Sequence, residues 1–282
     1  MPEITTVQET ITPDLAQEYL KRNQNGNRTI NMSNVRKYVR DMKNGRFKTT
    51  HQGIAFDEAG NLIDGQHRLT AIVQAGVPVN MMVTRNLPAD TFACIDRGYN
   101  RTFANCASIS NPGDDTMSRA MRDGVMSAAV RQIATCTIKQ KMAISTGEVM
   151  KLYETFAPQI ESVYNIMSAR RSGCHRSQVL SAAITALYSG VTTDAIEKFF
   201  NVFKLADITD CASFNPNAAI QWRRVLDNSR RNGGYLSARK VYLGTQNAIY
   251  NFVNANSVQN AKIPEKPRYD ISGAIKPIFT EV

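Results

Sequence analysis

The segment 61–76, NLIDGQHRLTAIVQAG, contains five consecutive residues that could carry out chemistry: Asp64, Gly65, Gln66, His67 and Arg68. A carboxylate can hold a metal ion or accept a hydroxyl proton, an imidazole transfers protons near neutral pH, and a guanidinium donates two hydrogen bonds to a phosphate. These residue types predict a phosphate-binding site with acid–base chemistry. Asp64 and His67 are its candidate catalytic groups, and Gly65, Gln66 and Arg68 are its candidate phosphate-binding groups.

The neighbouring pattern places this motif where a strand meets a helix. NLID is a short apolar run, whereas HRLTAIVQAG has helical spacing and ends at Gly76. An Asp-Gly pair permits a sharp turn, and the free N–H groups and positive dipole end of a first helical turn attract anions. The alternative is that Asp64 caps the helix while His67 and Arg68 lie exposed on its first turn.

Two helices are expected before this corner. The first begins after Thr12 as the N-cap, has Pro13 at its first position and ends before Gly26. The second covers SNVRKYVRDMKNG, with Ser33 as the N-cap and Gly45 at its end. Its apolar residues fall on one face: Val35, Tyr38, Val39 and Met42.

The strand signals are confined to the N-terminal part of the chain. GIAFD and NLID predict a hairpin, and VNMMVTR predicts a buried strand after Pro78. Helical patterns follow at about 115–135, 146–156, 158–169, 177–189, 193–204, 217–230 and 237–254. We therefore predict an α+β protein with an α/β domain over 1–107, an all-α domain over 108–255 and an irregular C-terminal tail over 256–282.

The composition is that of a globular, basic protein. Hydrophobic residues make up 43% of its 282 residues, and 34 Lys and Arg against 24 Asp and Glu leave a net charge of +10. Residues 108–282 hold 21 basic and 14 acidic side chains, which is most of the excess and favours polyanionic partners. Five dispersed cysteines without a CxxC pair favour free thiols. No apolar run of membrane-spanning length and no charged-then-apolar leader is visible, so a cytoplasmic location is expected.

The corner motif resembles that of a known superfamily. DGQHRLTA resembles the DGQHR signature of the ParB/sulfiredoxin superfamily, and Gly65, Arg68 and Ala71 fit the G-x-x-R-x-x-A spacing of the ParB nucleotide-binding box. Arg28 with NVRKYVRDMKNGRF is similar to the first ParB-type box. FACIDRGYNRTFAN, with Arg101, resembles the element that follows the core in phage and prophage members.

The resemblance spans about residues 10–107 and implies a fold and a nucleotide ligand. It adds Arg28 and Arg101 to the predicted nucleotide-binding residues, and it implies a nucleoside triphosphate cofactor with Mg²⁺ as the candidate metal. Members of the superfamily include CTP-gated DNA clamps, ATP-dependent sulfinic acid reductases, serine kinases and nucleases. Gln66 and His67 stand where the ParB box has an acidic and a basic residue, and Gln66 stands at the cysteine of sulfiredoxins, so thiol chemistry is not expected here.

A basic segment in the helical half is the candidate nucleic-acid contact. In QWRRVLDNSRRNGGYLSARK, the pair Arg223 and Arg224 precedes the pair Arg230 and Arg231 by seven residues, which places both pairs on one helix face. Such a stripe suits a phosphate backbone, and Trp222 and Tyr235 could stack on bases. The alternative is a solvated face with Trp222 in the core.

Two classes of function follow. The first is a ParB-like nucleotide-binding protein that acts at DNA, with the Asp64 to Arg68 corner as the ligand site. The alternative is a phosphotransferase or nuclease of the same fold, which uses Asp64 or His67 and a divalent metal. A structural role in a phage particle ranks third. The expected partners are a nucleotide and DNA, and no membrane association is expected. The chain could be a monomer or a homo-oligomer. Its expected location is the cytoplasm of a bacterial host cell.

Overall fold

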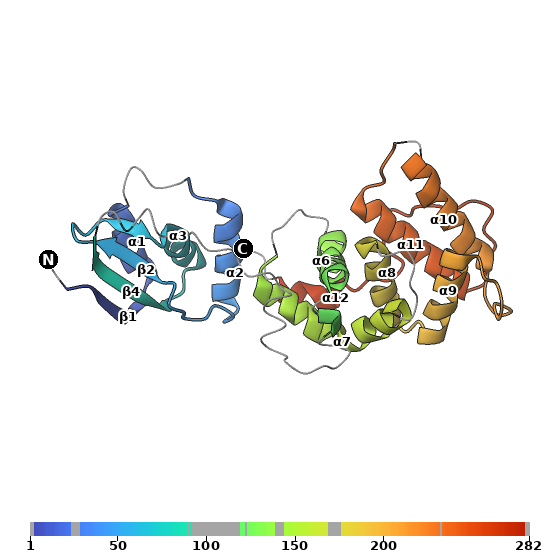
Figure 1. The fold of residues 1–282 in the computed structure, drawn as a ribbon, viewed down its shortest axis with the longest axis horizontal. Helices are drawn as coiled ribbons and strands as arrows, with labels where there is room; N and C mark the ends of the chain where they lie inside the picture. Colours follow the sequence, from blue (N-terminus) through green and yellow to red (C-terminus); the bar gives the residue numbers. More distant parts are fainter. Residues whose placement is uncertain are drawn as a thin grey trace. The chain divides into compact units, whose positions relative to one another are not determined.

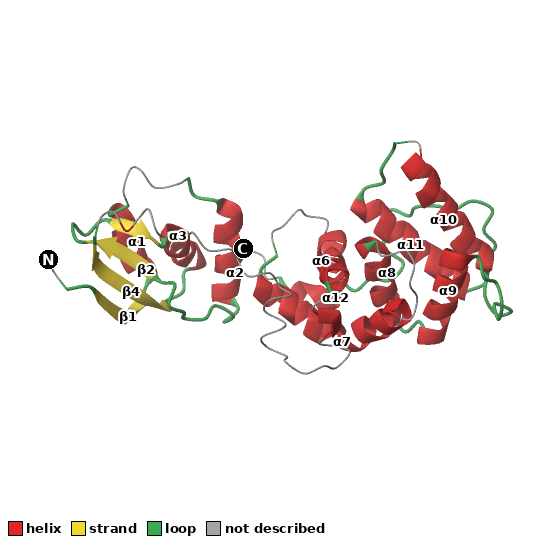
Figure 2. Ribbon diagram, in the orientation of Figure 1, coloured by secondary structure: helices red, strands yellow, loops and turns green. Residues whose placement is uncertain are grey.

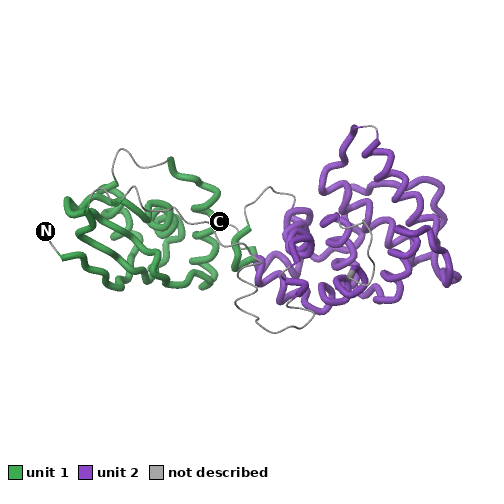
Figure 3. Tube along the Cα trace, in the orientation of Figure 1, with its two compact units in different colours: residues 1–100, 142–148, 279–282 green, residues 101–141, 149–278 purple. Residues whose placement is uncertain are grey.

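The structure is a computed structural model, and it describes residues 3–23, 29–88, 91, 119–121, 123–138, 144–168, 176–231 and 233–279 (Figures 1 and 2). The chain forms two compact units (Figure 3). Unit 1 comprises Met1–Asn100, Met142–Glu148 and Phe279–Val282, and unit 2 comprises Arg101–Lys141 and Val149–Ile278. Among the described residues, no helix has the length and apolar character needed to cross a membrane.

Unit 1 contains a small mixed sheet. Its strands are β1 (Thr5–Ile11), β2 (Ile54–Asp57), β3 (Leu62–Asp64) and β4 (Val79–Leu87), in the order β1-β4-β2-β3. β2 and β3 form the predicted antiparallel hairpin, β2 and β4 are parallel, and β1 pairs antiparallel with β4. Gly53 precedes β2 at a point where a Cβ atom would lie 1.7 Å from the Met82 carbonyl oxygen, so only glycine allows this close approach to β4.

Three helices pack beside this sheet: α1 (Pro13–Lys21), α2 (Met32–Lys43) and α3 (Gln66–Ala75). The predicted start of α1 is confirmed, because the Thr12 hydroxyl accepts the Leu15 N–H at 3.2 Å. For α2 the predicted cap is wrong. Asn31 caps the helix by accepting the Ser33 N–H at 3.0 Å, and Ser33 lies within the first turn. α3 ends at Gly76, which has a left-handed φ of 68° as predicted.

The core of unit 1 joins the inner face of the sheet to these helices. Its fully buried members come from every element of the unit and include Ile11, Ala16, Val35, Val39, Ile54, Leu62, Leu69, Ile72 and Val83. The period-2 and helical-period patterns of the sequence therefore converge on one apolar layer. α3 contacts both α1 and α2 (Figure 1).

The first turn of α7 (Thr146–Ser168) belongs to unit 1 and supplies a buried carboxylate. Glu148 is fully buried and forms an ion pair with Arg40 of α2, whose Nη2 lies 3.1 Å from Oε2. Ser145 and Glu148 form a capping box, in which each side chain accepts the backbone N–H of the other. Ser145 also donates to Asp41 at 2.9 Å, and Arg46 pairs with Asp41 at 3.2 Å. Burial is the main cause of a raised pKa of Asp41.

Unit 2 is helical. Its described residues form the helices α6 (Gly124–Ile138), the remainder of α7, α8 (Ser177–Tyr188), α9 (Thr193–Leu205), α10 (Pro216–Arg231), α11 (Ala238–Val253) and α12 (Ser272–Ile275), followed by the 3-10 turn η2 (Lys276–Ile278). The sequence predicted two helices where α7 lies, and α7 has non-helical backbone angles at Phe156, two residues before Pro158. The tail predicted over 256–282 lacks regular structure over 256–271 and then forms α12 and η2.

α8 and α11 are the central helices of unit 2. Residues 179–186 of α8 and 241–249 of α11 are buried without interruption, and the two helices contact each other. Gly244 lets α11 approach α10, because a Cβ atom there would lie 2.1 Å from the Trp222 ring. Trp222 is itself fully buried and donates to the Thr245 hydroxyl at 2.9 Å.

Candidate functional site

The turn between β3 and α3 has the geometry that the Asp-Gly pair predicted. Gly65 is the N-cap of α3 and has φ of +104°, a region that disfavours side chains. A Cβ atom at Gly65 would also lie 3.1 to 3.2 Å from two atoms of Ile54, which is tighter than ordinary packing. The N-cap residue of α3 is a glycine, so it supplies no capping side chain to the positive end of the helix dipole.

Asp64 and Arg68 are paired with each other at this corner. The Asp64 carboxylate accepts the Gly65 N–H at 2.6 Å and an Arg68 terminal N–H at 2.9 Å. Asp64 therefore does not cap α3, contrary to the alternative reading of the sequence. Arg68 is also not exposed, since only 14% of its side chain is accessible, and its Nε is buried without a hydrogen-bond partner among the described residues. A buried, unsatisfied guanidinium nitrogen is costly unless an acceptor approaches it.

Gln66 is buried and His67 is half-buried, and both side chains have protein partners. The Nε2 of His67 accepts the backbone N–H of Asn31 at 2.9 Å, so its lone pair holds the start of α2. Gln66 is 5% exposed and accepts from the Asn23 side chain at 3.3 Å. The catalytic role of His67 and the ligand contact of the Gln66 side chain stay predictions, and the structure gives both side chains a structural partner.

The remaining corner predictions lie outside the described residues. Arg28 and Arg101 fall there, as does the phage-type element around Arg101. The described residues that flank 24–28 both approach the corner, because Asn23 contacts Gln66 and Asn31 contacts His67. Within the described part of the chain, no group of three or more His, Cys, Asp or Glu side chains could hold a metal ion.

Unit 1 contains a second polar cluster that the sequence analysis missed. Arg85 of β4 and Tyr19 of α1 both bond to Glu9 of β1, with a Tyr19 to Glu9 distance of 2.8 Å. The guanidinium carbons of Arg85 and Arg22 lie 5.8 to 5.9 Å from the ring centroids of Tyr19 and Phe56. The Arg85 hydrogen bond lowers the pKa of Glu9, and burial raises the pKa of Tyr19. Side chains far apart in sequence form the cluster, so no local pattern signals it.

The basic segment of α10 divides into structural and exposed arginines. Arg223 donates to the carbonyl oxygens of Phe203, at 3.1 Å, and Lys204, so its charge stabilises the C-terminus of α9. Arg239 donates to the Cys136 carbonyl near the end of α6. One terminal nitrogen of Arg223 is thus engaged at a helix end, while 42% of the side chain is accessible, so its contact with a phosphate backbone stays a prediction.

The other members of the predicted stripe are accessible. Arg224, Arg230 and Arg231 are exposed, and Tyr235 is 80% exposed. Tyr235 belongs to the segment that joins α10 to α11. This segment is braced by Ser229, whose hydroxyl donates to the Gly234 carbonyl and accepts the Leu236 N–H. Trp222, the other predicted stacking residue, is buried, so that prediction is wrong.

The two thiols in the described part of the chain lack the features of a reactive site. Cys136 and Cys211 are buried and free, as predicted, and the other three cysteines lie outside the described residues. Burial raises the pKa of Cys136 to about 11, which disfavours the thiolate at neutral pH.

Comparison with known proteins assigns no family to the chain. Neither a protein-family search, nor a search of curated proteins, nor a search of solved structures gave a match. The ParB/sulfiredoxin resemblance therefore stays a prediction that depends on the corner motif.

Proposed function

We propose that this protein binds a phosphate-bearing nucleotide at the N-terminus of α3 and acts at DNA through the exposed basic residues of α10. The observation that carries the proposal is the Arg68 side chain. Its guanidinium lies in the first turn of α3, whose N-cap is a glycine, and Asp64 orients it at 2.9 Å. One of its nitrogens is buried and has no acceptor among the described residues. A phosphate that reaches this point would interact with the positive charge of the Arg68 guanidinium and with the positive end of the helix dipole together.

The ParB-like fold and a nucleoside triphosphate with Mg²⁺ are parts of the same proposal. The strand–turn–helix corner around Gly65 supports them, because backbone close to a helix start is how many nucleotide sites hold phosphates. The 2.9 Å pair with Arg68 engages one Asp64 oxygen, so a metal at this carboxylate would compete with the arginine. Phosphate binding by Arg68 is therefore the central claim, and a metal is secondary.

Arg68→Gln tests the nucleotide site. We expect about 10- to 100-fold weaker binding of the nucleotide identified by a thermal-shift screen with and without magnesium, because a charge-assisted hydrogen bond contributes about 1.5–3 kcal/mol. Arg36→Gln is the matched control, since Arg36 is exposed on α2 in the same unit. Equal affinities in the two variants, measured by calorimetry with both proteins folded, would remove the site assignment.

Asp64→Asn distinguishes the binding protein from the alternative phosphotransferase or nuclease. If Asp64 only orients Arg68, the neutral amide removes a competing anion and nucleotide binding tightens. If Asp64 takes a proton or holds a metal, turnover falls by orders of magnitude while binding is kept. Product formation from labelled nucleotide or DNA therefore separates the two classes.

Nucleic-acid contact is proposed for Arg224, Arg230, Arg231 and Tyr235. Positive charge at the end of α10 and an exposed ring at its tip suit a phosphate backbone and a base. Reversing the three arginines to glutamate should weaken DNA binding and flatten the dependence of log affinity on log salt by about 1 per lost contact. An unchanged salt slope in a folded triple variant would remove DNA from the proposal.

A further inference from the structure

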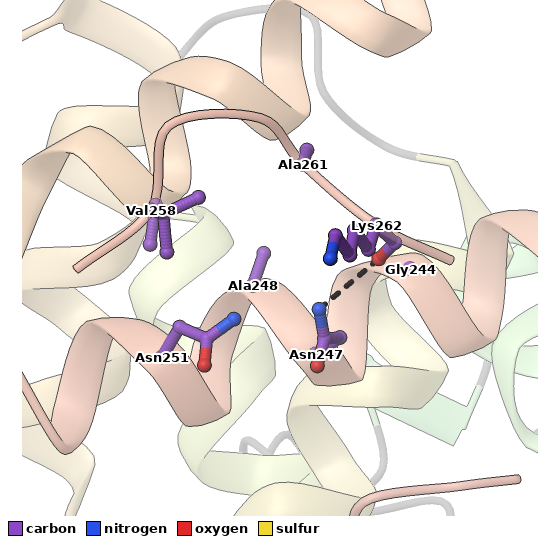
Figure 4. A pocket seen from close by; sticks show the side chains of 8 residues that line it. Gly244, Asn247, Ala248, Asn251, Val258, Ala261 and Lys262 are labelled. Carbon is purple, nitrogen blue, oxygen red and sulfur yellow. Dashed lines mark hydrogen bonds between the residues drawn. The ribbon is translucent and has the colours of Figure 1, made fainter. Parts of the chain in front are cut away.

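A groove lies between α11 and the strap, which we define as residues 254–271 after α11. Its volume is about 740 Å³, within the range of small-molecule sites. Polar side chains dominate its lining: Asn247, Asn251, Gln259, Lys262, Glu265 and Arg268. Figure 4 shows the smaller adjoining hollow, where the small residues Gly244, Ala248 and Ala261 leave space under the strap.

Arg268 is positioned at this groove by three contacts. Its guanidinium carbon lies 4.9 Å from the centroid of the Tyr250 ring, and its Nε donates to the Asn247 side-chain oxygen at 2.8 Å. Its backbone N–H donates at 3.1 Å to Gln246, which is fully buried. No described residue accepts from its two terminal nitrogens. These contacts orient the guanidinium and leave its two terminal nitrogens available to bind an anion.

The side-chain amide of Asn247, which contacts Arg268, also positions Lys262. Asn247 is 6% exposed, and its amide nitrogen donates to the Lys262 carbonyl at 3.0 Å, the dashed line in Figure 4. In that view the Lys262 side chain extends from the strap toward Ala248. No described carboxylate lies within ion-pair distance of Lys262 or Arg268. The lining contains these two cations and one acidic residue, Glu265, so its net charge is positive.

We propose that this groove binds a small phosphate ester of mononucleotide size. The Arg268 fork and the Lys262 ammonium supply donors for a tetrahedral dianion, and the guanidinium face opposite Tyr250 can stack on a planar base. The side-chain amides of Asn251 and Gln259 can hydrogen bond to sugar or base. The site is separate from the α3 corner, since all of its lining belongs to unit 2.

The experiment measures binding of AMP, inorganic phosphate and citrate by calorimetry in the Arg68→Gln background, which removes the α3 corner. We expect saturable binding of AMP and phosphate and weaker binding of citrate. Added AMP should slow hydrogen exchange in the strap. If the Arg68→Gln protein does not bind AMP, the groove proposal is overturned. The α3 proposal fails on a different result, namely that Arg68→Gln, as the only change, leaves the nucleotide affinity unchanged. Citrate that binds as tightly as AMP would overturn the phosphate assignment.

Variants locate the site. Arg268→Lys keeps the charge but loses the fork, so AMP should bind about tenfold more weakly. Lys266→Ala is the matched control, because it removes a strap charge that does not line the groove. Lys262→Ala provides a second test, since it keeps the backbone carbonyl that Asn247 contacts and should also weaken binding. Glu265→Gln should tighten it severalfold. Equal AMP affinities in the Arg268, Lys262 and Lys266 variants would overturn the proposal.

Discussion

Glu148→Gln should destabilise unit 1 more than any other charge-neutralising change in α7. Glu148 is fully buried, and the guanidinium of Arg40 beside it is 5% exposed. Removal of one partner from a buried ion pair typically costs about 3–5 kcal/mol, because the remaining charge stays desolvated. Gln keeps the shape and one acceptor for the Ser145 N–H, so we expect about 3 kcal/mol, the lower end of that range.

Hydrogen exchange followed by mass spectrometry measures this effect where it should occur. A loss of about 3 kcal/mol corresponds to roughly 100-fold faster exchange of α2 amides that open with the unit. Glu154→Gln is the control on the same helix, because the pair of Glu154 with Lys151 is exposed and contributes little. Trp222, the single tryptophan, lies in unit 2, and its fluorescence should report unchanged unfolding there.

One result would refute the reasoning. If α2 and the first turn of α7 exchange at the same rate in the Glu148→Gln and Glu154→Gln variants, the ion pair with Arg40 does not stabilise unit 1. A shift of the Trp222 transition alone would be equally inconsistent, because it would locate the loss in unit 2.

Two further predictions concern charges with a structural role. Arg223→Ala should lower the urea midpoint of Trp222 fluorescence by an amount equivalent to about 1–2 kcal/mol, because α9 loses its C-terminal donor. The DNA affinity should stay near that of the native protein. A folded, equally stable variant that binds DNA weakly would instead show that Arg223 contacts DNA. Because the Arg85 hydrogen bond lowers the pKa of Glu9, the ionised carboxylate stabilises the fold above the ordinary pKa of 4.5, and this contribution is lost as the pH falls through the lowered value. Glu9→Gln should therefore lower the melting temperature at neutral pH and flatten its decline in acid, and an unaltered acid decline would contradict the assignment.

The sequence predicted the elements that have a strong local signal. Gly45, Gly60 and Gly76 adopt positive φ where turns or helix ends were expected, and the β2–β3 hairpin leads into α3 as predicted. β1 was missed because TTVQETI is exposed over most of its length and shows little apolar alternation. An edge strand of this kind is stabilised by its pairing with β4, which is a nonlocal contact.

Chemical roles were harder to predict because they depend on tertiary partners. Helical spacing correctly placed Arg223 and Arg230 on one face of α10, but it could not show that the end of α9 lies against Arg223. The corner motif correctly located the turn at Gly65, yet the partners of His67 and Gln66 come from the chain before α2. The division into compact units follows the same rule, since Met142–Glu148 joins unit 1 through contacts with α2.

The origin of the Glu148 carboxylate has a consequence for biosynthesis. Glu148 follows Asn100, the end of the first segment of unit 1, by 148 − 100 = 48 residues. At translation rates of about 5–20 residues per second, the ribosome needs roughly 2–10 s to make them. During that interval the nascent N-terminal unit contains Arg40 but not its partner Glu148. The ion pair therefore forms only after residues 101–148 have been synthesised. A fragment that stops at residue 107 would remain permanently in that unfinished state.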